Sequence, residues 1–231
     1  GAHFVNDKMG WGVAEWGTIV HTEDGGKTWS FQKTGTTKAL LNVFFVDEQH
    51  GWAIGNSGEI IHTSDGGKTW EGQRSGVNRD LFGIYFIDAK TGWIVGDGGI
   101  VLHTTNGGQK WEPQAHLGEV WLSGVYFTDR FNGWMVGIEG LIMHTTDGGA
   151  TWKRQKSYAD SFLRNVFFLN SKEGWIVGGK GIILHTVDGG ENWRPQRSES
   201  RYNLNSIYMT SPEKGWIVGD LGVVLKYVVD K

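Results

Sequence analysis

The sequence predicts an all-β fold, a six-bladed β-propeller built from 41-residue repeats of four strands, whose last blade lacks its outer strand. The main observation is a Gly-Trp pair that recurs six times at intervals of 41 residues, at Trp11, Trp52, Trp93, Trp134, Trp175 and Trp216. A second series keeps the same interval but stops after five copies, at Trp29, Trp70, Trp111, Trp152 and Trp193. The chain also contains 37 Gly and only 3 Pro among 231 residues, which suits short strands joined by tight turns.

Each full repeat reads as four short strands separated by turn-forming Gly, Asn, Asp and Ser residues. In the copy at 40–79, the expected strands are 42–47, 52–55, 59–63 and 69–73. The first of these strands is apolar on both faces at 43–46, so each sheet must be covered on both sides. A four-stranded unit that requires a neighbour on each face is typical of a propeller blade.

The strand count indicates six blades in a single domain that spans residues 1–231. The first blade begins with a short strand at 3–6, and the last has three strands and ends at Val229. A linear solenoid would require polar end caps, whereas the first and last copies keep apolar residues such as Val13 and Ile217. These residues favour a propeller, and the sequence leaves open how its two ends meet.

A Thr-x-Asp-x-Gly-x-Thr-Trp motif, with small variations, joins the third and fourth strands of five copies. Its acidic or amide residue is Asp24, Asp65, Asn106, Asp147 or Asp188. A tight loop leaves backbone amides unpaired, and such a side chain can accept hydrogen bonds from them. The paired glycines allow positive φ. We interpret the motif as a structural device. Calcium binding is the alternative, but one carboxylate per loop is too few for the roughly six to eight oxygens that calcium takes.

A histidine also recurs once per full copy, at His21, His62, His103, His144 and His185. These residues fall on the third strand of each blade. With strands ~4.8 Å apart and zinc ligands at ~2.0–2.1 Å, one metal ion cannot collect them. We expect them to pack within the hairpin or to hydrogen-bond to the neighbouring turn. The two tryptophan series could form a sugar-binding ladder, but their regularity favours a core role in stacking the sheets.

The motif and the Gly-Trp-x-Val-Gly pattern, in segments such as 84–96 and 166–178, cover essentially the whole chain. The chain therefore resembles the Ycf48-like family of photosystem II assembly factors and their bacterial relatives. This family lies within the BNR or Asp-box propellers, which also include sialidases and xyloglucanases. The resemblance implies an assembly role and, because relatives are commonly exported, an extracytoplasmic location such as the periplasm or thylakoid lumen. Those assembly factors typically have seven blades, whereas this chain offers six copies.

Composition excludes several classes of function. A net charge of −3, from 22 basic and 25 acidic residues, attracts no phosphate backbone, so we expect no nucleic-acid partner. No apolar run approaches the ~18 residues of a membrane-spanning helix, so we expect no membrane insertion. The absence of Cys excludes disulfides, thiolate zinc sites and a cysteine nucleophile. No metal or other cofactor is expected.

Binding residues are expected where the copies differ, in the segments that lead into the first strands and in the loops between the second and third strands. In a propeller both lie on the top face, around the channel mouth, and the Asp boxes lie on the other face. The top face would carry aromatic and basic side chains, a mixture suited to a peptide or protein partner. The candidate partner-binding residues are Trp16, Lys38, Arg79, Trp121, Phe162, Arg164, Arg201 and Tyr202.

We expect a non-enzymatic binding or scaffold propeller without catalytic residues, and the resemblance implies a membrane-complex subunit as its protein or peptide partner. A sialidase-like glycosidase is one alternative, with Arg79, Arg164 and Arg201 on a substrate carboxylate. The sequence disfavours it, because no Arg-Ile-Pro stretch occurs and the constant 41-residue spacing leaves no insertion to wall a deep pocket. A carbohydrate-binding lectin, with Trp16 and Trp121 as stacking platforms, is the other alternative.

Overall fold

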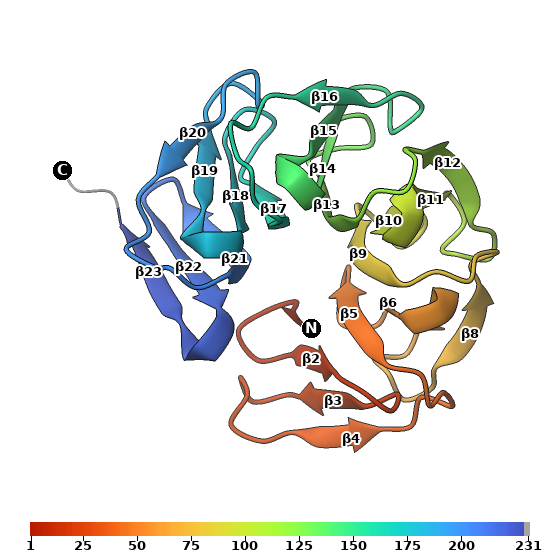
Figure 1. The fold of residues 1–231 in the computed structure, drawn as a ribbon. Helices are drawn as coiled ribbons and strands as arrows, with labels where there is room; N and C mark the ends of the chain where they lie inside the picture. The colour runs from red at the N-terminus through yellow and green to blue at the C-terminus, as the bar shows by residue number, and fades with distance from the viewer. Residues whose placement is uncertain (229–231) are drawn as a thin grey trace. The chain divides into compact units, whose positions relative to one another are not determined.

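The computed structural model describes residues 1–228, which form the six sheets shown in Figure 1. Five sheets have four antiparallel strands and the last has three, which confirms the predicted all-β, six-bladed propeller with an incomplete final blade. The chain divides into two compact units, Gly1–Glu119 and Val120–Lys231, each with three blades. The single domain expected for residues 1–231 stays a prediction. Within residues 1–228, none of the helical segments has the length and apolar character that crossing a membrane requires.

The first unit holds blades 1 to 3. Its strands are β1 (Ala2–Phe4), β2 (Gly10–Val13), β3 (Ile19–Thr22), β4 (Ser30–Gln32), β5 (Leu40–Phe45), β6 (Gly51–Gly55), β7 (Glu59–Thr63), β8 (Glu71–Arg74), β9 (Leu81–Phe86), β10 (Gly92–Gly96), β11 (Ile100–Thr104) and β12 (Glu112–His116). Two short 3-10 turns, η1 (Asn56–Gly58) and η2 (Asp97–Gly99), join the second and third strands of blades 2 and 3.

The second unit holds blades 4 to 6. Its strands are β13 (Leu122–Phe127), β14 (Gly133–Gly137), β15 (Ile142–Thr145), β16 (Lys153–Gln155), β17 (Leu163–Phe168), β18 (Gly174–Gly178), β19 (Ile183–Thr186), β20 (Arg194–Gln196), β21 (Leu204–Ser211), β22 (Lys214–Gly219) and β23 (Val224–Val228). The corresponding turns are η3 (Ile138–Gly140), η4 (Gly179–Gly181) and η5 (Asp220–Gly222). Val229, where the last strand is expected to end, lies outside the described residues.

Strand ends differ from the predicted positions by up to two residues, for local reasons. The first strand of blade 2 is predicted at 42–47, but β5 covers Leu40–Phe45. It ends before Asp47 because that carboxylate accepts hydrogen bonds from the amides of Gln49 and His50, both at 2.7 Å. Such an Asx turn reverses the chain and ends the strand.

Within each unit, consecutive blades are joined by stacked aromatic rings. Trp11 of the first Gly-Trp pair lies flat on Phe45 of the next blade, with ring centroids 3.6 Å apart. Trp70, from the Asp box of that next blade, meets Phe45 edge-on at 5.9 Å. The glycine of the next Gly-Trp pair makes room for the phenylalanine ring, because a Cβ on Gly51 would lie 2.4 Å from Phe45. The flat stack recurs for Trp52 on Phe86 and for Trp134 on Phe168.

Hydrogen bonds fix the same junction. Trp11 Nε1 donates to the carbonyl of Gly66, in the Asp box of blade 2, at 3.3 Å, and Gln32 Nε2 donates to the same oxygen at 3.1 Å. Gln32 Oε1 in turn accepts a hydrogen bond from Trp70 Nε1 at 3.2 Å. The glutamine bridge recurs with Gln73, Gly107 and Trp111, and with Gln155, Gly189 and Trp193. Each of these boxes therefore offers a backbone carbonyl to the preceding blade.

Each Asp box is a loop closed by its own side chains. In blade 2, Asp65 Oδ1 accepts from Thr63 Oγ1 at 2.8 Å and from the Thr69 amide at 2.9 Å, while Oδ2 accepts from Thr69 Oγ1 at 2.7 Å. Because Thr69 belongs to the box, the fourth strand starts at Glu71 instead of the predicted residue 69. Corresponding bonds are accepted by Asp24, Asn106, Asp147 and Asp188. This geometry suits the structural role of the box, which stays a prediction.

Two tryptophans at the ends of the series depart from the predicted core role. Trp216 is 46% exposed and Trp29 is 42% exposed, whereas Trp11 is fully buried, so the core interpretation is wrong at these two positions. The junction explains both. Trp216 lies in the last sheet of the second unit and, among residues 1–228, stacks on no phenylalanine as Trp11 does on Phe45. Trp29 has no glutamine from a preceding blade, and its Nε1 donates to the carbonyl of Gly26 at 3.1 Å.

We expect Trp134→Ala to destabilise the protein far more than Trp216→Ala. The fully buried Trp134 stacks on Phe168 at 3.7 Å and donates to the carbonyl of Gly189 at 3.1 Å. Its loss should cost about 3–5 kcal/mol of unfolding free energy. Trp216 is half-exposed, so its loss should cost well under half as much. Urea unfolding of the two variants checks this, and equal losses would show that the stack does not hold the blades together.

Acid should weaken the fold between about pH 4 and pH 2. Hydrogen bonds from Thr28, Thr69 and Thr151 lower the pKa of Asp24, Asp65 and Asp147 to about 2, from an ordinary 3.8. The unfolded chain therefore binds more protons than the folded chain in this range, so the stabilisation is complete above pH ~4 and is lost as the pH falls toward 2.

The triple variant Asp24→Asn, Asp65→Asn, Asp147→Asn keeps an acceptor oxygen at each box, as Asn106 does. Its Tm should fall less steeply with pH in this window than the Tm of the unmodified chain. Identical slopes would contradict the assignment of the pH dependence to the boxes.

Candidate functional site

The segments that vary between copies meet at one end of each blade. In blade 2, turn η1 is hydrogen-bonded to two lead-in segments. The Asn56 amide donates to the Ala39 carbonyl at 3.1 Å, ahead of β5, and the Gly58 amide donates to the Arg79 carbonyl at 2.8 Å, ahead of β9. In blade 4 the equivalent bonds join Ile138 to Trp121 and Gly140 to Ser161. Each of these loops therefore holds the segments that lead into two successive first strands, where the candidate residues lie. The Asp boxes lie at the opposite end of the blades.

In the first unit, the predicted basic residues are paired with carboxylates. Lys38 Nζ lies 2.9 Å from Glu59 Oε2, and Arg79 Nη1 lies 3.1 Å from Asp97 Oδ2. Arg79 Nη2 is also 3.4 Å from Glu119 Oε2. The hydrogen bond to Asp97 and the charge of Glu119 raise the pKa of Arg79. The positive charge at these two positions is therefore partly neutralised within the unit.

In the second unit, Trp121, Phe162 and Arg164 form a layered group. The two rings are stacked with centroids 6.0 Å apart and 21° between their planes. The guanidinium carbon of Arg164 lies 5.3 Å from the centre of the Phe162 ring. Arg164 Nε is buried and has no hydrogen-bond partner among the described residues. The group therefore combines an aromatic surface with a positive charge that lies beside one of its rings.

Three polar residues that were not predicted lie next to this group. Asn205 Nδ2 and Asn203 Nδ2 each donate to the carboxylate of Asp220 at 2.7 Å. These hydrogen bonds, with the nearby charge of Arg164, lower the pKa of Asp220. Asn205 Oδ1 is buried and, within residues 1–228, accepts no hydrogen bond. All three occupy positions that differ between copies, which is the signal that could have identified them.

The remaining predicted residues are exposed on their loops. Trp16 is 80% exposed, and Tyr202, in the segment ahead of β21, is 51% exposed. Arg201 precedes it and is also exposed. The role of all eight predicted residues in binding a partner stays a prediction.

The repeated histidines pack within their hairpins, as expected. Each imidazole lies against the Gly-Trp tryptophan of the adjacent strand, for example His21 stacked on Trp11 at 4.6 Å and His144 stacked on Trp134 at 4.5 Å. Burial lowers the pKa of both histidines. Within residues 1–228, no three His, Asp or Glu side chains are placed to hold one metal ion.

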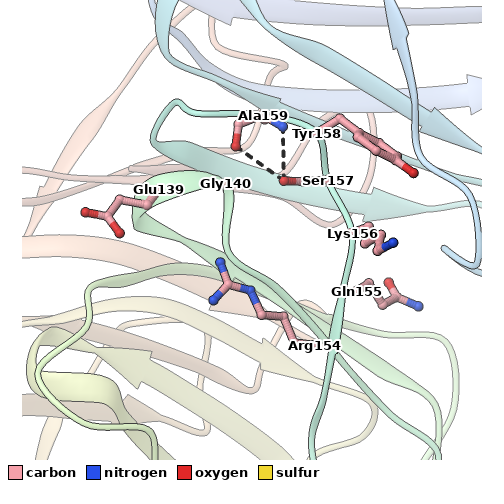
Figure 2. Close-up of a pocket in the computed structure, with 8 residues that line it drawn as sticks. All are labelled: Glu139, Gly140, Arg154, Gln155, Lys156, Ser157, Tyr158 and Ala159. Atoms are coloured by element: carbon pink, nitrogen blue, oxygen red, sulfur yellow. Dashed lines mark hydrogen bonds between the residues drawn. The ribbon is translucent and has the colours of Figure 1, made fainter.

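A shallow pocket of about 430 Å³ lies in blade 4, between turn η3 and the segment that follows β16 (Figure 2). Figure 2 shows the guanidinium of Arg154 pointing toward the loop that carries Glu139. Glu139 and Tyr158 both have positive φ, at 54° and 55°. None of the pocket residues was predicted as a binding residue, because a pocket formed by two loops leaves no spacing signal in the sequence.

The family model described as photosynthesis system II assembly factor YCF48 matches residues 30–119 and 117–202. These two matches together span more than half of the chain. No curated protein matches the chain.

Solved structures share the fold at low sequence identity. A structure described as YCF48 bound to D1 peptide is 21% identical, with a TM-score of 0.57, over 100% of this chain and 91% of that one. YCF48 from Cyanidioschyzon merolae is 19% identical, with a TM-score of 0.57, over 98% and 94%. An ancestral GH74 enzyme is 11% identical, with a TM-score of 0.76, over 95% of this chain but 34% of its own. These structures show the fold, and the family model shows that the chain belongs to the photosynthesis system II assembly factor YCF48 family.

Proposed function

We propose that this chain is a non-enzymatic scaffold that binds a peptide segment of a membrane-complex subunit and helps to assemble or stabilise that complex. The observation that carries the proposal is the group of Trp121, Phe162 and Arg164. Its stacked rings lie beside the charged guanidinium of Arg164. An apolar side chain of a peptide can lie on the rings while Arg164 donates to a backbone carbonyl or a carboxylate.

The ionised Asp220 extends this recognition to a second kind of group. Its two oxygens are held by Asn203 and Asn205, so its orientation is set before any partner arrives. A preorganised acceptor lowers the entropy cost of binding a peptide amide or a basic side chain. Aromatic, basic and acidic groups therefore lie within one unit, as recognition of a peptide requires.

Family membership supports the same function. The family is described as an assembly factor of photosynthesis system II, and one structure of the same fold is described as bound to a D1 peptide. We take a D1 peptide as the partner class to test first. An extracytoplasmic location, which the resemblance implies, is part of the proposal.

Catalysis is not part of the proposal. In the sialidase-like alternative, Arg79 would have to clamp a substrate carboxylate, but it is already engaged by Asp97 and Glu119. A glycosidase also requires two carboxyl groups that flank the bond to be cleaved. The likeness to a GH74 enzyme concerns the fold and supplies no such pair.

Binding of a synthetic D1 peptide, measured by isothermal titration calorimetry, tests the proposal. We expect Arg164→Gln to weaken binding by at least about tenfold, because a charge-assisted hydrogen bond is lost while the aliphatic stem is kept. Arg79→Gln should weaken it less, since Arg79 is already paired. Lys172→Gln is the matched control, because Lys172 is exposed and lies in the turn between β17 and β18, at the other end of the same blade as Arg164.

Two results would contradict this account. If the unmodified chain does not bind the peptide, a D1 peptide is excluded as its partner. Equal losses in Arg164→Gln and Lys172→Gln would indicate unspecific attraction between charges. Glycan binding that is lost in Trp16→Ala would instead favour the lectin alternative, because Trp16 is the most exposed of the predicted aromatic residues.

A further inference from the structure

We propose that the three-stranded blade 6 is a docking site for an Asp-box strand of another polypeptide chain. An Asp-box strand here means an Asp box followed by a short extended strand, as in the segment 186–196 of blade 5. All residues of the site lie in blades 5 and 6 of the second unit. The inference does not depend on the proposed function, because none of these residues belongs to the Trp121, Phe162 and Arg164 group.

The junction between blades 4 and 5 shows what an Asp-box strand supplies to the blade before it. Trp134 Nε1 and Gln155 Nε2 both donate to the carbonyl of Gly189 at 3.1 Å. Gln155 Oε1 accepts a hydrogen bond from Trp193 Nε1 at 3.1 Å. Because Gly189 and Trp193 belong to the Asp box of blade 5, the box gives the preceding blade one acceptor and one donor.

The junction between blades 5 and 6 lacks both groups. Trp175 and Gln196 lie 41 residues after Trp134 and Gln155 and occupy the equivalent positions. Trp175 Nε1 and Gln196 Oε1 are buried, and neither has a hydrogen-bond partner among residues 1–228. A buried polar atom without a partner destabilises the fold. The two atoms are one donor and one acceptor, which is the pattern that an Asp box satisfies.

Tyr227 fills part of the place of the missing box. Its Oη accepts a hydrogen bond from Gln196 Nε2 at 2.8 Å, in place of the glycine carbonyl. Its ring meets Trp175 edge-on, with centroids 5.9 Å apart. Tyr227 therefore satisfies one of the three polar atoms at this junction and covers the other two.

The sequence of blade 6 cannot form a box at this position. In blade 5 the box is closed by a 2.7 Å hydrogen bond from Thr186 Oγ1 to Asp188 Oδ1. The residues 41 positions later are Tyr227 and Val229. Valine offers no carboxylate to accept such a bond, so the acceptor and the donor must come from a different segment.

The outer edge of blade 6 is open to the strand that follows such a box. In blade 5, β19 pairs with β20, with Ile183 opposite Gln196 and His185 opposite Arg194. The equivalent strand of blade 6 is β23, which pairs with β22, and no strand among residues 1–228 pairs with its other edge. An extended segment can add to such an edge through backbone hydrogen bonds.

Docking exchanges one hydrogen bond for several. The half-buried ring of Tyr227 has to move, which breaks its bond with Gln196. The box carbonyl then accepts from Trp175 Nε1 and Gln196 Nε2, and the box tryptophan donates to Gln196 Oε1. The backbone pairs along β23 are gained in addition, so the exchange favours the bound state.

The experiment uses a fluorescein-labelled synthetic peptide of residues 186–196 and measures fluorescence anisotropy with the complete chain. We expect saturable binding. The same peptide with Trp193→Phe lacks the indole N–H and should bind at least about threefold more weakly, because the bond to Gln196 Oε1 is lost. This change is made in the peptide and leaves the folding of the protein untouched.

Variants of the protein test the two sides of the exchange. Tyr227→Ala should bind the unmodified peptide at least about threefold more tightly, because no hydrogen bond of Tyr227 has to be broken first. Trp175→Phe should bind it at least about threefold more weakly. Trp134→Phe is the matched control and should stay within about twofold, since Trp134 is also fully buried but already donates to Gly189.

Three results would overturn the inference and leave the proposed function intact. The first is the absence of saturable binding both to the unmodified chain and to Tyr227→Ala. The second is equal affinity for the unmodified and the Trp193→Phe peptides, because the box would then make no contact with Gln196. The third is an equal loss in Trp175→Phe and Trp134→Phe, which would show a general effect of core substitution.

Discussion

The structure depends on the flat stack of a tryptophan on a phenylalanine at the junction between successive blades. Each sheet is apolar on both faces, so no blade can bury its own side chains, and the stack of Trp11 on Phe45 shows how a neighbour completes it. The hydrogen bonds of Gln32 and Trp11 to the Gly66 carbonyl give the contact a fixed register. The Asp box sets the position of that carbonyl, so the box and the stack act as one unit. Stability then accumulates from one junction to the next, as it does in other repeat proteins.

This arrangement separates the residues that hold the fold from those available for recognition. The junction uses the strands and the Asp boxes at one end of the blades, and these are nearly the same in every copy. At the other end, backbone hydrogen bonds hold the loops in place, so the side chains there contribute little to the stability of the fold. The Trp121, Phe162 and Arg164 group occupies positions that this division leaves free. A regular scaffold can therefore present an irregular surface.

Much of the fold could be predicted from the repeat, because a spacing of 41 residues fixes the blade count and the place of each strand. The exposure of Trp29 and Trp216 could not, since the local pattern there is the same as at the buried tryptophans of each series. The pairing of Arg79 with Asp97 and Glu119, and of Asp220 with Asn203 and Asn205, joins residues that lie 15 to 40 positions apart. Such pairs depend on distances across loops, which leave no periodic signal. The positive φ angles of Trp16, Glu139 and Leu221 could not be predicted either, because these residue types do not signal positive φ as Gly does.

A double-mutant cycle on Trp134 and Phe168 tests most directly whether the stack joins the blades. The unfolding free energies of Trp134→Leu, Phe168→Leu, the double variant and the unmodified chain would be measured in urea at one pH. If the two rings stabilise each other across the junction, the coupling energy should be about 0.5–1.5 kcal/mol, beyond what either residue contributes through burial alone. A coupling energy near zero would contradict the account, because each ring would then only fill space in its own blade.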